Sequence, residues 1–449
     1  MARKLFGTDG IRGVAGRYPL DAVTVNAVGI ALGEWAKEHE SPAQVLIGMD
    51  TRESGPALAA EVAGGLARSG VEARLAGVTT TPGIAWLTRT GPFVAGVMIS
   101  ASHNPYRDNG IKVFDHSGYK LPDETELSLE HRIFSILAKD LHPRATEPHL
   151  DESLEEAYLR FLSSVCKTRL DGLDLVVDAA NGSASRLAPR LFEGLGARVR
   201  TISGSPDGRN INLNCGSLHL EALRSAVVER GAMLGVAFDG DADRAMFVTG
   251  SGRIVDGDGV LFLAARELHA SGKLVKPGAE PAVVATVMSN IGLEVALKSL
   301  GIGLLRSAVG DRYVLEQMLE SQIRLGGEQS GHIIFLEHAT TGDGLLTALR
   351  VFEIGAANRW DLDVLLADFK TYPQVLMNVR VKEKRPFDEL PRVVSAIQRA
   401  EHALGAHGRV LVRYSGTEPL ARVMIEGPEQ DLVDSLAGRI AEAIRSELT

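Results

Sequence analysis

Three aspartates alternate along a short polar segment that follows an apolar run. Asp239, Asp241 and Asp243 occupy positions i, i+2 and i+4 of "DGDADR". This spacing can direct three carboxylates toward one point, where they repel one another unless a cation neutralises them. All-oxygen ligands favour a hard ion, Mg²⁺ or Ca²⁺. A solvated acidic turn is the alternative, and an EF-hand is excluded because positions six and twelve are Arg244 and Gly250.

A second polar segment, "ISASHNPYRDNGIK", also follows an apolar run and contains a serine beside a histidine. Ser102 and His103 suggest a nucleophile and its base, but sequence neighbours seldom adopt the hydrogen-bonding geometry that this pairing needs. A turn rich in Ser, Asn and Pro with capping side chains is the other interpretation. By pattern alone, both interpretations stay open.

Two further segments have residue types that bind sugars or anions. In "GGEQSGH", Glu328, Ser330 and His332 alternate and could bind the hydroxyls of a polyol, although an ordinary turn with a satisfied histidine is favoured for this segment alone. In "RYSGTEPL", backbone N–H groups of a glycine-containing turn and an arginine can form an anion nest, and a plain hairpin turn is the alternative. The nest residues are Arg413, Ser415, Gly416 and Thr417. Other candidates are "FGTDGIRG", which carries Arg12, and the Gly-Asp turn of "AVGDRYV".

The composition is that of an ordinary globular protein with several domains. The chain has 449 residues, 45% apolar and 23% charged, and a net charge of -9, which suggests roughly three or four domains and no nucleic-acid partner. Anions must therefore be bound by local Arg, Lys, metal or backbone N–H groups. Two cysteines, no secretory signal and no run of 18 apolar residues lead us to expect a cytoplasmic protein without a membrane partner.

Strand and helix patterns alternate and restart twice along the chain. Residues 44–50 are a predicted strand, and Leu58, Val62 and Leu66 mark the buried face of the helix that follows. Such order predicts parallel sheets with helices on both faces. After a linker at 369–374, a β-α-β-β-α order predicts a small antiparallel sheet with helices packed on it. The predicted domains are 1–153, 154–256, 257–370 and 371–449.

Each predicted domain contains one of the four polar segments. Ligands of open α/β sheets bind at the carboxyl ends of strands, so we expect the four segments to converge on one cleft. In this order the segments resemble the signature of the α-D-phosphohexomutase superfamily. "FGTDGIRG", "NINLNCGSLHLE", "IVDGDGVLFL", "ATVMSNIGLE", "VGDRYVLEQM" and "HATTGDG" are similar, within that superfamily, to the bacterial phosphoglucosamine mutases.

The resemblance covers the whole chain and implies both a fold and a reaction. The implied fold is three mixed α/β domains plus a C-terminal α+β domain, similar to the TATA-binding-protein fold, around a central cleft. The implied reaction interconverts glucosamine 6-phosphate and glucosamine 1-phosphate, for UDP-N-acetylglucosamine and peptidoglycan biosynthesis. The alternatives are a phosphoglucomutase or phosphomannomutase, and a catalytically silent sugar-phosphate sensor.

The resemblance also implies roles for individual residues. Ser102 would be phosphorylated and, with Asp239, Asp241 and Asp243, would bind one Mg²⁺ per subunit. Lys112 would be the general base or an electrostatic aid, ahead of His332 as proton acceptor. Arg12 would approach the reacting centre, and His103 would support the loop and its phosphate. The implied substrate contacts are Arg244 to phosphate, Glu328 and Ser330 to sugar hydroxyls, and Arg413, Ser415, Gly416, Thr417 and Arg422 to the non-reacting phosphate.

A glucosamine 1,6-bisphosphate intermediate would turn end over end during the reaction. This motion predicts a fourth domain that opens and closes about residues 372–374. The resemblance implies a homodimer through the first domain. Autophosphorylation, bisphosphate priming and a kinase are all open as the source of the first phosphate.

Overall fold

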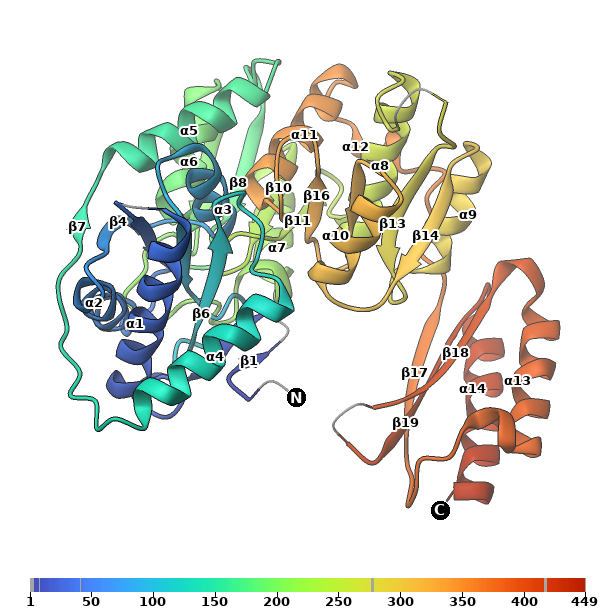
Figure 1. The fold of residues 1–449 in the computed structure, drawn as a ribbon. Helices are drawn as coiled ribbons and strands as arrows, with labels where there is room; N and C mark the ends of the chain where they lie inside the picture. Colours follow the sequence, from blue (N-terminus) through green and yellow to red (C-terminus); the bar gives the residue numbers. More distant parts are fainter. Residues whose placement is uncertain (1–3, 8, 41, 276–277, 416–417, 449) are drawn as a thin grey trace.

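The computed structural model describes residues 4–7, 9–40, 42–275, 278–415 and 418–448. The chain forms four sheets in succession, and we refer to the parts of the chain around them as domains 1 to 4 (Figure 1). Among the described residues, no helix is both long enough and apolar enough to cross a bilayer.

Domain 1 has a seven-stranded mixed sheet. Its order is β1 (Phe6–Gly7), β2 (Gly10–Val14), β6 (Asp108–Asp115), β5 (Ala95–Ile99), β3 (Gln44–Met49), β4 (Glu72–Val78) and β7 (His149–Leu150). Strands β3, β4 and β5 are parallel, as the strand–helix order predicts. Strands β2 and β6 run antiparallel to their neighbours. The prediction of a parallel sheet therefore holds for β3, β4 and β5 and was wrong for β2 and β6, because residues 100–107 turn the chain directly from β5 into β6.

Four helices cover this sheet: α1 (Ala22–His39), α2 (Gly55–Arg68), α3 (Thr81–Thr90) and α4 (Asp123–Leu137). Helix α2 packs on α1, and its predicted face of Leu58, Val62 and Leu66 is buried.

Domains 2 and 3 repeat this arrangement on a smaller scale. The five-stranded sheet has the order β12 (Ile254–Val255), β11 (Ala245–Thr249), β10 (Leu234–Phe238), β8 (Asp174–Asp178) and β9 (Arg198–Ile202). The four-stranded sheet has the order β14 (Gly303–Ser307), β13 (Ala282–Thr286), β15 (Leu325–Gly327) and β16 (Ile333–Phe335). In both sheets, parallel strands are joined to an antiparallel partner by a hairpin.

The helices of domain 2 are α6 (Ala184–Gly194) and α7 (Glu221–Arg230). Those of domain 3 are α8 (Gly257–Ala270), α9 (Ile291–Ser299), α10 (Asp311–Glu320), α11 (Gly344–Ala357) and α12 (Leu362–Leu365). Helix α5 (Ser153–Val165) contacts α3, α6 and α11, so it lies where the first three domains meet. One cluster of buried side chains continues from domain 1 through domains 2 and 3.

Domain 4 has its own core and stands apart from the other three domains (Figure 1). Its elements are β17 (Gln374–Arg380), α13 (Pro391–Leu404), β18 (Arg409–Tyr414), β19 (Leu420–Glu426) and α14 (Gln430–Leu448). The antiparallel order β17-β19-β18 agrees with the predicted β-α-β-β-α pattern.

The segment before β17 attaches domain 4 to domain 3. Phe369, placed in the predicted linker, is buried against Phe262 of domain 3. Tyr372 exchanges two hydrogen bonds with the Asn290 side chain, each 2.9 Å long. Arg409 of domain 4 donates to the Ser289 carbonyl at 3.2 Å. The free connection between the domains is therefore shorter than the predicted linker.

A buried carboxylate contributes to the junction of α5 and α11. Asp343 accepts hydrogen bonds from the Leu346 N–H at 3.0 Å and from the Tyr158 hydroxyl at 2.6 Å. Burial raises the pKa of Asp343 to about 6. A carboxyl with a raised pKa binds its proton more tightly in the folded state. The resulting stabilisation is complete below the unfolded-state pKa and is lost as pH rises through the folded-state value.

We predict that Asp343→Asn removes this pH dependence while still capping α11. Compared with the variant, the wild type should gain about 1 kcal/mol of stability when the pH falls from about 8 to about 5. Thermal unfolding of both proteins across this range measures the difference. Asp361→Asn, at the exposed cap of α12, is the control and should show no such trend. Parallel pH profiles for wild type and Asp343→Asn would contradict the prediction.

Candidate active site

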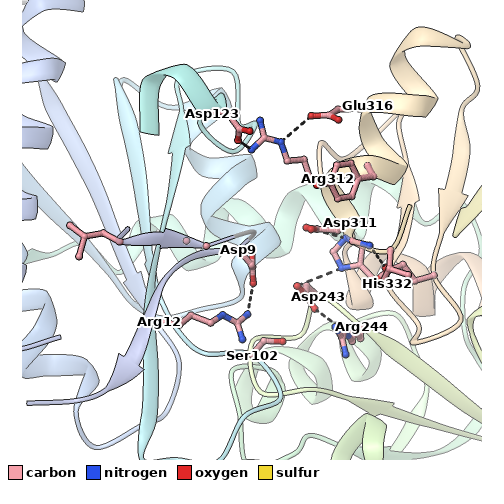
Figure 2. Close-up of a pocket in the computed structure, with 17 residues that line it drawn as sticks. Asp9, Arg12, Ser102, Asp123, Asp243, Arg244, Asp311, Arg312, Glu316 and His332 are labelled. Carbon is pink, nitrogen blue, oxygen red and sulfur yellow. Dashed lines mark hydrogen bonds and ion pairs between the residues drawn. The ribbon is translucent and has the colours of Figure 1, made fainter. Parts of the chain in front are cut away.

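Three of the four polar segments are hairpin connections that meet at one cleft. They join β5 to β6, β10 to β11 and β15 to β16. The cleft has a volume of about 530 Å³ (Figure 2). Domain 1 lines it with Leu5, Gly7, Asp9, Gly10, Arg12, Ser102 and Asp123, domain 2 with Asp243 and Arg244, and domain 3 with residues 309–313, Glu316, Glu328 and His332.

The three alternating aspartates converge beside this cleft. One carboxylate oxygen from each of Asp239, Asp241 and Asp243 lies within 4.8 Å of the others, and all three residues are buried. Ala242 makes the turn between them in a left-handed conformation, with φ 55°. Burial and the two neighbouring carboxylates raise the pKa of Asp239.

The donor set fits a divalent cation. All the candidate ligand atoms are oxygens. Among the described residues, the Oδ1 atoms of Asp241 and Asp243 are buried without a hydrogen-bond partner. Buried polar atoms are normally satisfied, so these two oxygens have lone pairs available to a ligand. A hard cation would both neutralise the three carboxylates and use their free oxygens.

Ser102 lies directly against this cluster. Its hydroxyl donates a hydrogen bond of 2.5 Å to Asp239, from which it is 137 residues distant in sequence. The residue is 2% exposed and has a left-handed backbone, with φ 52°. The Nδ1 atom of His103 is 3.5 Å from the Ser102 oxygen. Burial, followed by the charges of Arg244 and Arg12, lowers the pKa of His103.

Lys112 lies behind the aspartates as a buried cation. Its Nζ atom is 3.0 Å from Asp241, 3.1 Å from Asp9 and 4.0 Å from Asp243. Burial alone would disfavour the charge, but the carboxylates of Asp241 and Asp9 raise the pKa of Lys112. A lysine held charged in this way suits electrostatic stabilisation and is a poor proton acceptor. Of the two roles predicted for Lys112, its environment favours the electrostatic one.

These contacts continue across the domains and, through His332, close into a ring. Lys120 bridges Asp9 of domain 1 and Asp311 of domain 3, 2.6 Å from the latter. His332 lies between Asp311, at 3.9 Å, and Asp243, at 3.5 Å. We call the group formed by these residues together with Lys112 and Asp241 the charge ring. Its members are Asp9, Lys112, Asp241, Asp243, His332, Asp311 and Lys120.

Both ring nitrogens of His332 have partners. Nε2 accepts a hydrogen bond of 2.9 Å from the Gly342 N–H, and Nδ1 faces Asp243. Although burial opposes the charged form, Asp243 and Asp311 raise the pKa of His332. The bond from the Gly342 N–H uses the lone pair of Nε2, while Nδ1 is directed toward Asp243. His332 therefore has no free nitrogen with which to accept a substrate proton.

Of the remaining predicted residues of domains 1 to 3, Arg12, Arg244 and Glu328 line the cleft, and Ser330 bonds to Glu328. Arg12 pairs with Asp9, and Arg244 lies 3.8 Å from Asp243 (Figure 2). The Glu328 carboxylate accepts bonds from the Gly310 N–H at 3.1 Å and from the Ser330 hydroxyl at 3.3 Å. Two guanidinium groups and a carboxylate thus face one cavity, which suits a ligand with both phosphate and hydroxyl groups.

No described residue of the domain 4 segment that was predicted to bind phosphate lines this cleft. Ser415 accepts bonds from the Arg422 guanidinium at 3.5 Å and from the Glu418 N–H at 3.3 Å. Among the described residues, those that line the cleft all come from the other domains. Arg413 lies at the end of β18, and Gly416 and Thr417 lie outside the described residues. The expected convergence therefore holds for three segments, and the fourth stands off because domain 4 has a separate core.

Sequence reasoning missed several groups at this site. Asp9 was not selected, although it lies in the same segment as Arg12. Asp311 was noted only as part of a Gly-Asp turn. Lys120 has no recognisable motif. Arg312 of domain 3 pairs with Asp123 of domain 1 and with Glu316 (Figure 2).

The sequence matches one protein family along nearly its whole length. The family is described as phosphoglucomutase/phosphomannomutase. Its alpha/beta/alpha domains I, II and III match residues 3–140, 156–252 and 256–372, and its C-terminal domain matches residues 376–443.

The chain is also similar to individual proteins. A phosphoglucosamine mutase of Solibacter usitatus (strain Ellin6076) is 58% identical over all of both chains. One from Koribacter versatilis (strain Ellin345) is 52% identical over 99% of this chain and 97% of its own.

Solved structures share the fold. A phosphoglucomutase/phosphomannomutase family protein of Burkholderia thailandensis has a TM-score of 0.80 at 24% identity, covering 98% of this chain and 97% of its own. The Aspergillus fumigatus N-acetylphosphoglucosamine mutase, solved with GlcNAc-6P and magnesium, has a TM-score of 0.66 at 20% identity, covering 99% and 96%.

The charge ring yields a prediction about stability. Lys120→Met should remove the cation that bridges Asp9 and Asp311. Asp9 keeps Lys112 and Arg12 as partners, whereas Asp311 loses its lysine, so we expect a cost of about 2 kcal/mol. The thermal midpoint should fall, and adding Asp311→Asn should recover part of the loss. Lys298→Met, at an exposed position of α9, is the control. If Lys120→Met and Lys298→Met shifted the midpoint equally, the bridge would have no stabilising role.

Proposed function

Because the chain belongs to the phosphoglucomutase/phosphomannomutase family, we propose that it interconverts glucosamine 6-phosphate and glucosamine 1-phosphate. The substrate follows from relatives named phosphoglucosamine mutase that are 58% and 52% identical over essentially the full length. The chain is thus an isomerase that works by phosphoryl transfer. The observation that carries the mechanism is the hydrogen bond of Ser102 to Asp239 inside a buried carboxylate cluster.

In this proposal, Ser102 carries the phosphoryl group that is transferred. The bond between its Oγ and phosphorus breaks while a sugar hydroxyl oxygen forms its own bond to phosphorus. The proton that the sugar hydroxyl loses is balanced by the proton that the Ser102 oxygen takes up as it returns to a hydroxyl. The glucosamine 1,6-bisphosphate formed turns over in the cleft and returns its other phosphoryl group to Ser102. Such transfers depend mainly on in-line positioning and on neutralisation of charge. A serine fixed at the end of a buried strand suits the first requirement.

We propose that Asp239, Asp241 and Asp243 hold Mg²⁺ together with an oxygen of the Ser102 phosphate. When bound, the ion would neutralise charge on the transferring oxygens. The all-oxygen donor set supports this choice. The Aspergillus fumigatus relative was solved with magnesium.

The surrounding cations supply permanent charge. Lys112 stays protonated and offsets the carboxylates of Asp241 and Asp9. Arg12 and Arg244 line the cleft on either side of Ser102 and are placed to donate to phosphate oxygens. His103, with its lowered pKa, supports the loop without adding charge.

Glu328 and Ser330 would bind sugar hydroxyls from domain 3. The non-reacting phosphate would be bound by the segment of Arg413, Ser415, Gly416, Thr417 and Arg422 after domain 4 moves toward the cleft. The tether that Tyr372 makes with Asn290 supports the proposal that domain 4 pivots at residues 372–374.

Three further points belong to the same proposal. We place the enzyme in the reducing cytoplasm, because Cys166 and Cys215 are both free and buried. The proposed enzyme is a homodimer whose subunits contact each other through domain 1. The first phosphate on Ser102 would come from the enzyme itself, a sugar bisphosphate or a kinase.

The function is tested on Ser102. Intact mass of the purified enzyme should show about 80 Da of added phosphate, absent in Ser102→Ala. That variant should lose nearly all turnover yet keep its thermal midpoint, whereas Ser164→Ala, at an exposed position of α5, should match wild type. kcat/KM should be highest for glucosamine phosphate. A preference for glucose or mannose phosphate would reassign the substrate, and binding without turnover or phosphate would indicate a sensor.

Closure of domain 4 makes a separate prediction. Small-angle scattering should show a smaller radius of gyration when glucosamine 6-phosphate is added to wild type, because a bound phosphate links domain 4 to the other domains. Arg413→Ala should contract less at the same concentration, since it lacks the guanidinium that grips the phosphate. Identical profiles with and without ligand in wild type would contradict the closure.

A further inference from the structure

The backbone of Ser102 is held on both sides by hydrogen bonds that the function above does not use. Its N–H donates to the Ser100 hydroxyl at 2.9 Å, and that hydroxyl donates to Asp50 at 2.6 Å. Its carbonyl accepts bonds from Arg52 at 2.8 Å and from the Nδ2 atom of Asn212 at 2.9 Å. The peptide groups around a residue with a left-handed φ of 52° are therefore fixed from two directions.

Arg52 is the anchor within domain 1. Its side chain is fully buried, and Nε donates to Asp50 at 2.8 Å. The other four N–H groups donate to carbonyls of the Ser102 loop, so all five donors are used. The four acceptors are the carbonyls of Ser102, Asn104, Pro105 and Asp108. Arg52 therefore holds the whole loop in its conformation, and its role is not specific to Ser102.

Asn212 is the anchor from domain 2. Its Nδ2 atom donates both to Ser102 and, at 3.1 Å, to the Asn104 carbonyl. Its own backbone is left-handed, with φ 58°, and its N–H donates to Ala180 at 2.8 Å. Asn212 is therefore held by domain 2 while it contacts the loop of domain 1.

The docking of this segment is reinforced nearby. The Glu53 N–H of domain 1 donates to the Gly208 carbonyl at 2.9 Å, and the Glu53 carboxylate pairs with Arg209 at 2.6 Å. The segment that carries Asn212 is thus attached to domain 1 at a second point.

The metal-binding segment passes the same carbonyl. A Cβ atom on Gly240 would lie 2.5 Å from the Ser102 oxygen and 2.8 Å from the Asn212 nitrogen. Only a glycine fits between Asp239 and Asp241 for this reason. The Ser102 carbonyl is consequently the point where the serine loop, the Asn212 segment and the aspartate segment meet.

We propose that Asn212 is a positioning residue for phosphoryl transfer. It fixes the Ser102 peptide so that Oγ keeps its direction toward Asp239 through repeated gain and loss of the phosphoryl group. The inference rests on the proposed role of Ser102. A left-handed serine is an unfavourable conformation that its surroundings must maintain. Without Asn212 the Ser102 carbonyl keeps only the bond from Arg52 and loses its attachment to domain 2. The peptide can then shift, and a misplacement of about 1 Å can cost about 100-fold in rate.

Asn212→Gly and Asn214→Gly form a matched pair of variants. Both residues have left-handed backbones, which glycine tolerates, and Asn214 is exposed two positions further along the same segment. Asn212→Gly should lower kcat about 10- to 100-fold and change KM for glucosamine 6-phosphate less than about twofold. Asn214→Gly should match wild type. The ³¹P resonance of the phosphoserine should shift or broaden only in Asn212→Gly.

Asn212→Asp separates hydrogen bonding from space filling. It keeps the size of the side chain but replaces the donating nitrogen with an oxygen that repels the two carbonyls. We expect it to lose at least as much kcat as Asn212→Gly. Wild-type kcat in Asn212→Asp would overturn the proposal, and so would an Asn212→Gly effect confined to KM or equal to that of Asn214→Gly.

The wild type, measured alongside, separates the two levels of inference. A wild type without phosphate on Ser102 and without turnover rejects the proposed function and this inference together. A phosphorylated, active wild type whose kcat and ³¹P resonance are unchanged by Asn212→Gly rejects the inference alone.

Discussion

Carboxylates crowded together away from water need compensating charge, and the arrangement of the first three domains meets this need. Burial and like charges raise the pKa of Asp239, so the cluster is unfavourable by itself. Lys112 offsets part of this charge by pairing with Asp241 of domain 2 and Asp9 of domain 1. Lys120 pairs with Asp9 and with Asp311 of domain 3, so the two lysines together link the three domains. The same residues that would attract a cation therefore also require the domains to assemble. Assembly and the site depend on one set of ion pairs.

The hairpins explain how three domains deliver polar groups to one place. In each, a buried parallel strand turns back into an antiparallel neighbour, and the turn projects from the same edge of its sheet. Such a turn is short and is fixed at both ends by ladder hydrogen bonds, so its side chains have little freedom. Arg52 adds a third attachment for the serine loop, through four carbonyl groups. Rigid strands thereby give a turn the precision that phosphoryl transfer requires.

The sequence predicted the fold class, the family and the segments that carry chemistry, because each depends on residue types close together in the chain. The charge ring could not be predicted from the sequence, because its members are far apart in the chain. Lys120 and Asp311 are 191 residues apart and meet only because two domains pack. The parallel-sheet prediction failed because periodicity identifies strands but not their direction. Four segments were expected to line the cleft, but only those of domains 1, 2 and 3 do so among the described residues. The residues of the Arg413 segment do not determine the distance between domain 4 and the other domains, so the sequence could not predict this difference.

The separate core of domain 4 has a consequence for how the chain can vary. Buried side chains run without interruption through domains 1, 2 and 3, so a substitution at one of their junctions is felt in more than one domain. Domain 4 packs its sheet and helices among themselves. Substitutions in the core of domain 4 can therefore accumulate, or the domain can be replaced by that of a related chain, while the geometry around Ser102 is unchanged.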